Sequence, residues 1–142
     1  MKHLFSIMLV SLTLLGLSCK EGNKKEEGPS QMERVLAIHD EVMPKMGELG
    51  KLVGQLKERA GTSKSSEQYE MAIKDLQKAN VAMMDWMKEF GDRFSSKEIL
   101  DDAQLSEQKK LLLAEEEEKV KLLKDQITSS MARAKALLAQ RD

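Results

Sequence analysis

Apolar residues recur at helical spacing through most of the chain after residue 30, and this periodicity restricts the fold more than any other feature of the sequence. Over residues 30–60 they repeat every seven residues, which places them on one face of a helix. No segment alternates apolar and polar residues convincingly, as a half-buried strand does. We therefore expect an all-α domain over residues 30–142. The two apolar rows of the first helix are Met32, His39, Met46, Val53 and Ala60, and Val35, Val42, Leu49 and Leu56.

The start of this helix and an interruption within it can be predicted from local chemistry. Ser30 and Glu33 have the spacing of a capping box, in which each side chain accepts a hydrogen bond from the backbone amide of the other residue. Pro44 has no amide proton and crowds the carbonyl of Asp40, so we expect a kink near residues 40–44.

Two further long helices are expected. The second begins near Ser65 or Ser66 and ends at Gly91. A short helix follows to Leu100, and the last helix begins around Ser106 and continues to the C-terminus. These lengths and connections predict an up-down-up antiparallel three-helix bundle of long, coiled-coil-like helices. The expected core positions are Tyr69, Ile73, Leu76, Asn80, Met83, Met87 and Phe90, and Leu112, Leu113, Val120, Leu123, Ile127, Met131, Ala134, Leu137 and Leu138.

Two polar residues fall on or beside these apolar rows. Asn80 lies within the seam of the second helix, where a satisfied buried amide fixes helix register at a cost in stability. The glutamates 115–118 have the composition of a solvated face. Within this run, Glu116 lies three residues after Leu113 and four before Val120, so we expect it on or beside the seam of the last helix.

The N-terminal segment has the layout of an export signal. Lys2 and His3 form a short basic region, and residues 4–17 form an apolar run. A run of fourteen residues is too short to cross a bilayer, which needs ~20, and a charged tract follows it. We expect residues 1–18 to be a signal peptide.

Cys19 decides which kind of signal peptide this is. The stretch Leu15-Gly16-Leu17-Ser18-Cys19 resembles the lipobox of bacterial lipoproteins, although Gly16 stands where the lipobox usually has Leu. The resemblance implies cleavage before Cys19 and acylation of its thiol and amine. The alternative is an ordinary signal peptide that contains Cys19 by chance. Since the chain has one Cys, a disulfide framework is excluded, and acylation accounts for a lone thiol in an exported protein.

Residues 19–29 are expected to form a lipidated, flexible tether, because no apolar residue follows Cys19 before Pro29. Glu21, and not Asp, follows Lys20, so the aspartate that resembles an inner-membrane retention signal is absent at that position. By resemblance to lipoproteins that lack this signal, we expect an outer-membrane lipoprotein on the periplasmic side or at the cell surface. The Lys20-Glu21 pair also resembles surface-export signals.

Composition and motifs exclude several functions. The chain is 33% charged, but its formal net charge is −1, so the basic footprint of a nucleic-acid-binding protein is absent. No phosphate-binding loop, Cys pair or His-Glu-x-x-His motif occurs. We expect no catalytic residue and no cofactor, and we interpret the chain as a non-enzyme.

Four segments resemble a family of small lipoproteins from Bacteroidetes that carries the label "viral A-type inclusion protein". The resemblance covers nearly the whole exported domain and implies no enzymatic activity, cofactor or known partner. The segments are Met32-Glu33-Arg34-Val35, Ile38-His39-Asp40-Glu41-Val42-Met43-Pro44-Lys45-Met46-Gly47, Lys74-Asp75-Leu76 and Met83-Met84-Asp85-Trp86-Met87.

Three functions fit these observations. The first is a membrane-anchored helical module that binds a partner protein or a second copy of the chain. Met84 and Trp86 flank the seam of the second helix and are its candidate contacts, provided that they are exposed together with Met43. The second is a soft-metal binding or sensing protein. The third is a holdase-like periplasmic chaperone, because the flexible side chains of ten Met residues adapt to varied clients.

His39 has three possible roles in its seam position: a core residue, a metal ligand or a contact for a partner. As a core residue it would have its ring satisfied by backbone, water, Asn80 or Glu116. Antiparallel packing is expected to place it opposite residues 83–87 and in one layer with residues 112–116. As a metal ligand it would act with thioethers, since thioether and imidazole suit Cu(I). The candidate ligands are His39, Met43, Met83 and Met87.

Overall fold

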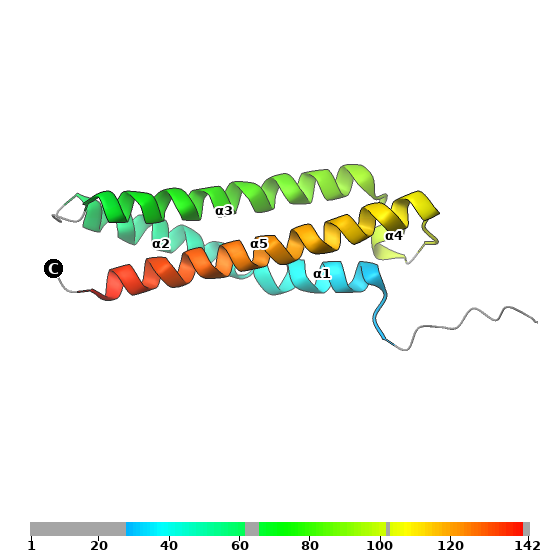
Figure 1. Cartoon of the computed structure of the whole chain (residues 1–142), viewed down its shortest axis with the longest axis horizontal. Coiled ribbons are helices and arrows are strands. Elements are labelled where there is room, and N and C mark those ends of the chain that lie inside the picture. The colour runs from blue at the N-terminus through cyan, green and yellow to red at the C-terminus, as the bar shows by residue number, and fades with distance from the viewer. Residues whose placement is uncertain (1–27, 62–65, 102, 141–142) are drawn as a thin grey trace, which may run out of the picture.

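The structure is a computed structural model that describes residues 28–61, 66–101 and 103–140. Of these residues 87% are helical and none is in a strand, which confirms the all-α prediction. The helices lie side by side as an elongated bundle (Figure 1). The predicted signal peptide, Cys19 and most of the tether lie outside the described residues. The helices are α1 (Gln31–Val42), α2 (Lys45–Ala60), α3 (Ser66–Arg93), α4 (Ser96–Leu100) and α5 (Glu107–Ala139).

Side chains at the helix starts explain where the helices begin. The predicted capping box of α1 is present: the Ser30 amide donates to the Glu33 carboxylate at 2.6 Å, and the Glu33 amide donates to the Ser30 hydroxyl at 3.2 Å. Ser95 and Glu98 form a second capping box that starts α4, which confirms the expected short helix. The hydroxyl of Ser106 caps α5.

The predicted kink at Pro44 is a complete interruption between two helices. α1 ends at Val42, where the Met43 amide still donates to the His39 carbonyl at 2.9 Å, and α2 begins at Lys45. The break lets the two segments take different neighbours. α2 packs on α3, and α1 packs mainly on α5 (Figure 1).

The prediction that Gly91 ends the second long helix is wrong, because α3 continues to Arg93. The reason is the next turn of the chain. The Phe94 amide donates to the Phe90 carbonyl at 3.0 Å, and the buried Phe94 ring lies 4.9 Å from the Phe90 ring. Burial of these rings stabilises the last turn beyond the glycine more than the glycine weakens it.

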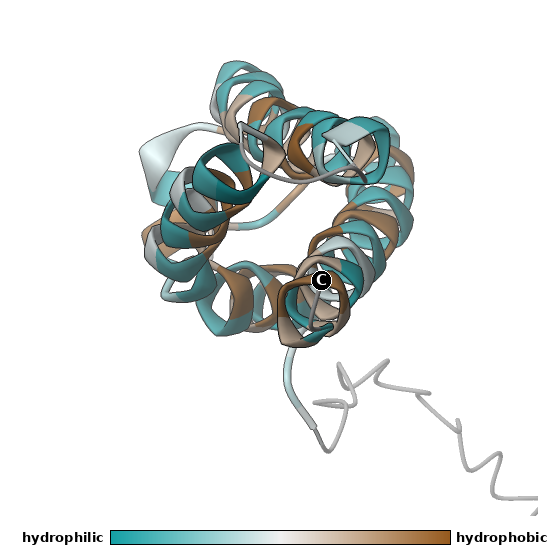
Figure 2. Cartoon of the chain, turned by 90° about the vertical axis from the view of Figure 1, so that its left-hand side faces the viewer, coloured by the Kyte–Doolittle hydropathy of each residue, from teal (hydrophilic) through white to brown (hydrophobic). Residues whose placement is uncertain are grey.

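The core lies between α1 and α2 on one side and α3 and α5 on the others, and Figure 2 looks along this shared interior. The row Val35, Val42, Leu49 and Leu56 is buried as predicted. On α3 the expected seam is shifted by one residue in two places. Ala79 and Trp86 are buried, whereas Asn80 and Met87 are only half-buried. The remaining buried apolar residues are Met32, Leu52, Tyr69, Ile73, Leu76, Met83, Phe90, Phe94, Leu113, Val120, Leu123, Ile127, Met131 and Ala134.

Candidate functional site

His39 lies on α1 with its side chain 23% exposed, and both ring nitrogens have close neighbours. Its Nδ1 is 2.9 Å from Oδ1 of Asp40, and its Nε2 is 3.2 Å from Sδ of Met87 on α3. The ring centroid is 5.9 Å from that of Trp86. His39 therefore faces the turn 83–87 of α3, as the sequence predicted. Its contact with Met87 connects α1 to α3.

The polar partners expected for His39 have other neighbours. Glu116 binds Arg93 at 2.7 Å and Lys119 at 3.0 Å, and no contact joins it or Asn80 to His39 among the described residues. The layer of α5 beside His39 was also predicted wrongly. The ion pairs Arg34–Glu117 and Glu41–Lys124 lie before and after His39 along α1, so its layer on α5 falls between residues 117 and 124. The cause lies at the start of α5, whose first turns pack against α4, as the 2.6 Å pair between Glu98 and Lys109 shows.

The remaining metal candidates from the sequence are Met43 and Met83. Met43 is half-buried at the end of α1, and Met83 is fully buried on α3. Each lies one helical turn from a member of the His39–Met87 contact. In the described part of the chain, no group of three or more His, Cys, Asp or Glu side chains is placed to hold a metal ion.

The two candidates for partner binding have different surroundings. Met84 is 51% exposed on α3, whereas Trp86 is 5% exposed and belongs to the core. Trp86 stacks on Phe90 with ring centroids 5.0 Å apart, so it starts an aromatic row that continues to Phe94. A binding surface made of Met43, Met84 and Trp86 required all three to be exposed, and of these only Met84 is.

Two of the glutamates 115–118 are buried, although the run has the composition of a solvated face. Glu116 is fully buried on the seam, as its spacing indicated, with Arg93 and Lys119 on one of its oxygens. Sequence reasoning missed the burial of Glu117, because its main partner belongs to α1. No local pattern in the sequence indicates this contact, since Arg34 and Glu117 are 83 positions apart.

Glu117 is held by two residues of α1. Its carboxylate accepts hydrogen bonds from Nε and Nη2 of Arg34, each at 3.1 Å, and from the side-chain amide Nε2 of Gln31 at 2.9 Å. These bonds favour the charged form and lower the pKa of Glu117 to about 2. The contact closes α1 onto α5.

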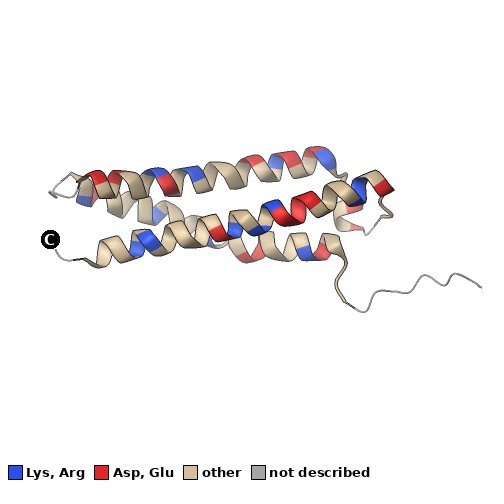
Figure 3. Ribbon diagram, in the orientation of Figure 1, with Lys and Arg blue, Asp and Glu red and all other residues tan. Residues whose placement is uncertain are grey.

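The exposed surface combines mixed charge with a few apolar side chains. Both acidic and basic residues are distributed along α3 and α5 (Figure 3). Val81 is 55% exposed and borders a shallow groove between α2 and α3 that contains Val53. A second shallow groove, between α3 and α5, is lined by Ala82 and by Leu122, which is 68% exposed. The apolar surface thus extends across α3 from one groove to the other.

The fold and these sites define a helical-bundle protein with a charged surface and an apolar patch on α3. No family model, no curated protein and no solved structure matches the chain. None of the described helices combines the length and the apolar character needed to span a bilayer.

Proposed function

We propose that the chain is a lipid-anchored envelope protein whose helical domain is a protein-interaction module that pairs with a second copy of itself. The anchor is proposed from the lipobox-like sequence at Cys19. The domain is proposed to be an up-down-up bundle, in which α1 and α2 together form the first arm. Two sets of ion pairs with α5 support this arrangement. Between the first arm and α5 the residue numbers rise together, as in parallel helices, whereas between α3 and α5 one number rises as the other falls, as in antiparallel helices. The two sets are Arg34–Glu117, Glu41–Lys124 and Glu48–Lys135, and Arg93–Glu116 and Asp75–Arg133.

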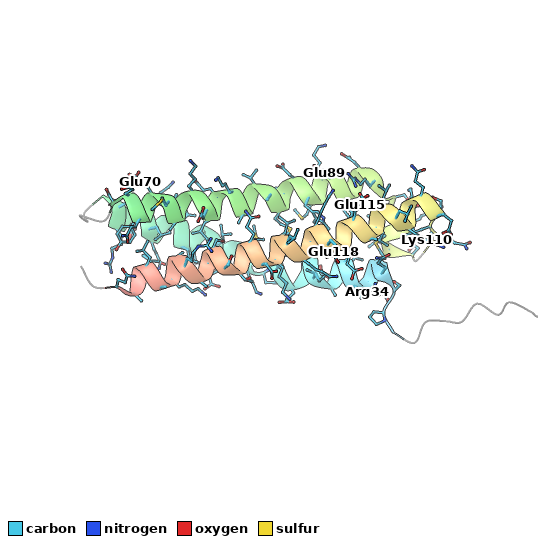
Figure 4. All side chains as sticks on the ribbon, in the orientation of Figure 1. Arg34, Glu70, Glu89, Lys110, Glu115 and Glu118 are labelled. Carbon is cyan, nitrogen blue, oxygen red and sulfur yellow. The ribbon has the colours of Figure 1, made fainter. Side chains whose placement is uncertain are left out.

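The observation that carries the pairing is the outer face of α3, on which Figure 4 labels Glu70 and Glu89. Exposed residues recur here at intervals of three or four, so they share one face. An apolar residue is central, two lysines precede it, and two acidic residues follow it; Lys88, also on this side, is paired with Asp92 of the same helix at 2.9 Å. The residues are Lys74, Lys78, Val81, Asp85 and Glu89.

The charged residues lie at equal distances on the two sides of the apolar centre and have opposite signs. Lys78 and Asp85 are equally distant from the Val81–Ala82 peptide bond, and so are Lys74 and Glu89. In an interface with a twofold axis, residue i of one copy meets residue j of the other, and j meets i. Two antiparallel copies of α3 centred on this bond would therefore place each lysine against an acidic residue.

The same face opposes other modes of association. In a parallel pair, Lys74 and Lys78 would each meet the same lysine of the second chain, and contacts between like charges are unfavourable. Exposed ion pairs contribute only about 0.2 to 1 kcal/mol each, so the charges set orientation. The affinity must come from the apolar side chains of Val81, Met84 and Leu122, which are each more than half exposed.

The pairing can be tested by charge reversal in the anchored protein. One tagged chain carries Lys74→Glu and Lys78→Glu, and a second, with a different tag, carries Asp85→Lys and Glu89→Lys. We expect neither variant to co-purify with its own kind from detergent-solubilised membranes, whereas the two variants together should co-purify.

A matched control reverses Lys51 and Lys57, which are exposed on α2, and should leave self-association unchanged. A disulfide formed by Val81→Cys in intact cells, but not by Lys51→Cys, would give independent support. Wild-type protein that stays monomeric at the membrane, or that self-associates regardless of the charges on α3, would rule out this interface. Capture of a different protein through Val81 would indicate a partner other than a second copy.

A further inference from the structure

We propose that His39 and Met87 form a binding site for a soft monovalent metal ion, Cu(I) or its analogue Ag(I). The imidazole Nε2 and the thioether Sδ lie 3.2 Å apart and come from α1 and α3. Nitrogen of this kind and thioether sulfur are donors that suit Cu(I). The site lies between helices and not on the outer face of α3, so it does not depend on the proposed pairing.

The His39 ring is placed between two groups that accept hydrogen bonds. Nδ1 faces a carboxylate oxygen of Asp40 at 2.9 Å, and Nε2 faces the Met87 sulfur. A neutral imidazole has a single N–H, and neither an ionised carboxylate nor a thioether has a proton to donate. When that N–H is donated to Asp40, the Nε2 lone pair points at the sulfur lone pairs. A proton or a soft cation at Nε2 makes this contact attractive.

Asp40 gives the ring the orientation that a metal ligand needs. Histidine ligands ordinarily donate their second N–H to a carboxylate or carbonyl, which fixes the tautomer and raises the basicity of the other nitrogen. Here the carboxylate is on the adjacent residue and is largely exposed, while the His39 side chain is 23% exposed. Nε2 is thus directed inward to Met87, and the ring still has a solvent-facing edge through which an ion can enter.

Trp86 forms an apolar wall beside the two donors. Its ring is buried and lies 5.9 Å from the His39 ring, and Phe90 stacks behind it. The face of an indole attracts a cation. A monovalent soft ion is better suited to this enclosed, weakly polar site than a strongly hydrated divalent ion, because the site has no charged ligand to offset the loss of hydration.

The separation of the donors leaves room for a further ligand. With metal–nitrogen and metal–sulfur bonds of ~2.0 and ~2.3 Å, as at zinc sites, an ion bound to both atoms takes a bent geometry and keeps an open position. Met43 is the C-cap residue of α1, four positions after His39, and Met83 lies one turn before Met87 on α3. Both carry the same thioether donor.

The site can be tested by titrating the mature, detergent-solubilised chain with Ag(I), and with Cu(I) under reducing conditions against a competing chelator. The chain contains one Trp, so fluorescence of Trp86 reports an ion bound beside it. We expect saturable, sub-micromolar binding with a change in Trp86 emission and a shift of the Met87 methyl NMR signal. His39→Gln and Met87→Leu should each abolish the fluorescence response, and Asp40→Asn should weaken binding about tenfold.

Met71→Leu is the matched control, since Met71 is exposed on the same helix. It should bind the ions as wild type does, and Met87→Leu conserves core volume well enough to fold. Absence of binding in wild type overturns the proposal. The proposal also fails when binding persists in His39→Gln and Met87→Leu, or is lost equally in Met71→Leu.

Discussion

The ionisation of Glu117 matters for the packing of α1 on α5. Its carboxylate is nearly enclosed, and Arg34 reaches it with two nitrogens in the forked geometry that suits a carboxylate. Gln31 adds a third hydrogen bond from the same helix. These contacts add to the burial of Met32, Val35 and Val42 in holding the short helix α1 on the bundle.

The first prediction concerns acid stability. The pKa of Glu117 is about 2 in the folded chain, against an ordinary value of 4.5, so the unfolded chain binds more protons between these values. Its contribution to the free energy of unfolding is therefore complete above pH 4.5 and is lost as the pH falls through about 2. Arg34→Met should lower stability at neutral pH by about 1 kcal/mol and reduce this acid dependence.

Urea melts at several pH values measure both effects. Lys88→Met is the control, because it removes an exposed ion pair with Asp92 and should change stability by less than about 0.5 kcal/mol. An Arg34→Met variant whose acid dependence equals that of wild type would contradict the assigned role of Glu117.

The contrast between Glu116 and Glu117 shows which buried polar residues can be predicted. Glu116 keeps the spacing of the apolar seam, so its burial follows from helix geometry alone. Burial of Glu117 depends on Arg34, 83 positions away in the chain, and no local pattern carries that information. The His39–Met87 contact could be predicted because both residues lie on predicted apolar rows.

At the scale of single helices, α2 contains glycines that alanine could replace with a gain in stability. Gly47 and Gly54 lie within the helix, and a Cβ atom added at either position would meet no atom within 4 Å. Glycine in a helix costs ~1 kcal/mol relative to alanine. Packing does not require these glycines in the described chain.

We therefore expect Gly47→Ala and Gly54→Ala each to raise the free energy of unfolding by about 0.5 to 1 kcal/mol. Thermal or urea unfolding followed by circular dichroism measures the change. Gly28→Ala is the contrasting control, because φ of Gly28 is +148° and an alanine there gains nothing. Loss of stability in the two helix variants would contradict the open space beside these positions.

Helix starts were predictable and one helix end was not, for a physical reason. The caps at Ser30 and Ser106 depend on neighbours within three residues. The end of α3 depends on whether Phe94 finds a buried place, which only the folded chain decides. The seam of α3 shifted for a similar cause, since the ring of Trp86 packs beside His39 of α1 and on Phe90.

At the scale of the whole molecule, the layer of α5 beside His39 was misjudged because the short helix α4 could be predicted but its packing could not. α4 folds over the end of the bundle, and Lys109 binds Glu98 at 2.6 Å while it also lies 5.8 Å from the centre of the Phe94 ring. The first turns of α5 are used in this cap. The pairing of α5 with α1 therefore begins later along α5 than equal loop lengths would suggest.

Attachment to the membrane is the last prediction, and it rests on the sequence, since Cys19 lies outside the described residues. Each buried CH₂ of an acyl chain contributes about 0.8 kcal/mol, and two or more chains give stable anchoring where one is marginal. Cys19→Ser removes the acceptor, so we expect loss of labelling by an alkynyl fatty acid and release of the chain from washed membranes.

The variant with Val81→Glu separates anchoring from pairing. It should retain the fatty-acid label and the membrane association of wild type, but not the self-association proposed for α3. Because the acylated residue and the pairing face are separated by the tether, the two properties are expected to fail independently. Fractionation and labelling that are unchanged by Cys19→Ser would contradict the lipoprotein assignment and would make attachment, if observed, a property of the helical domain.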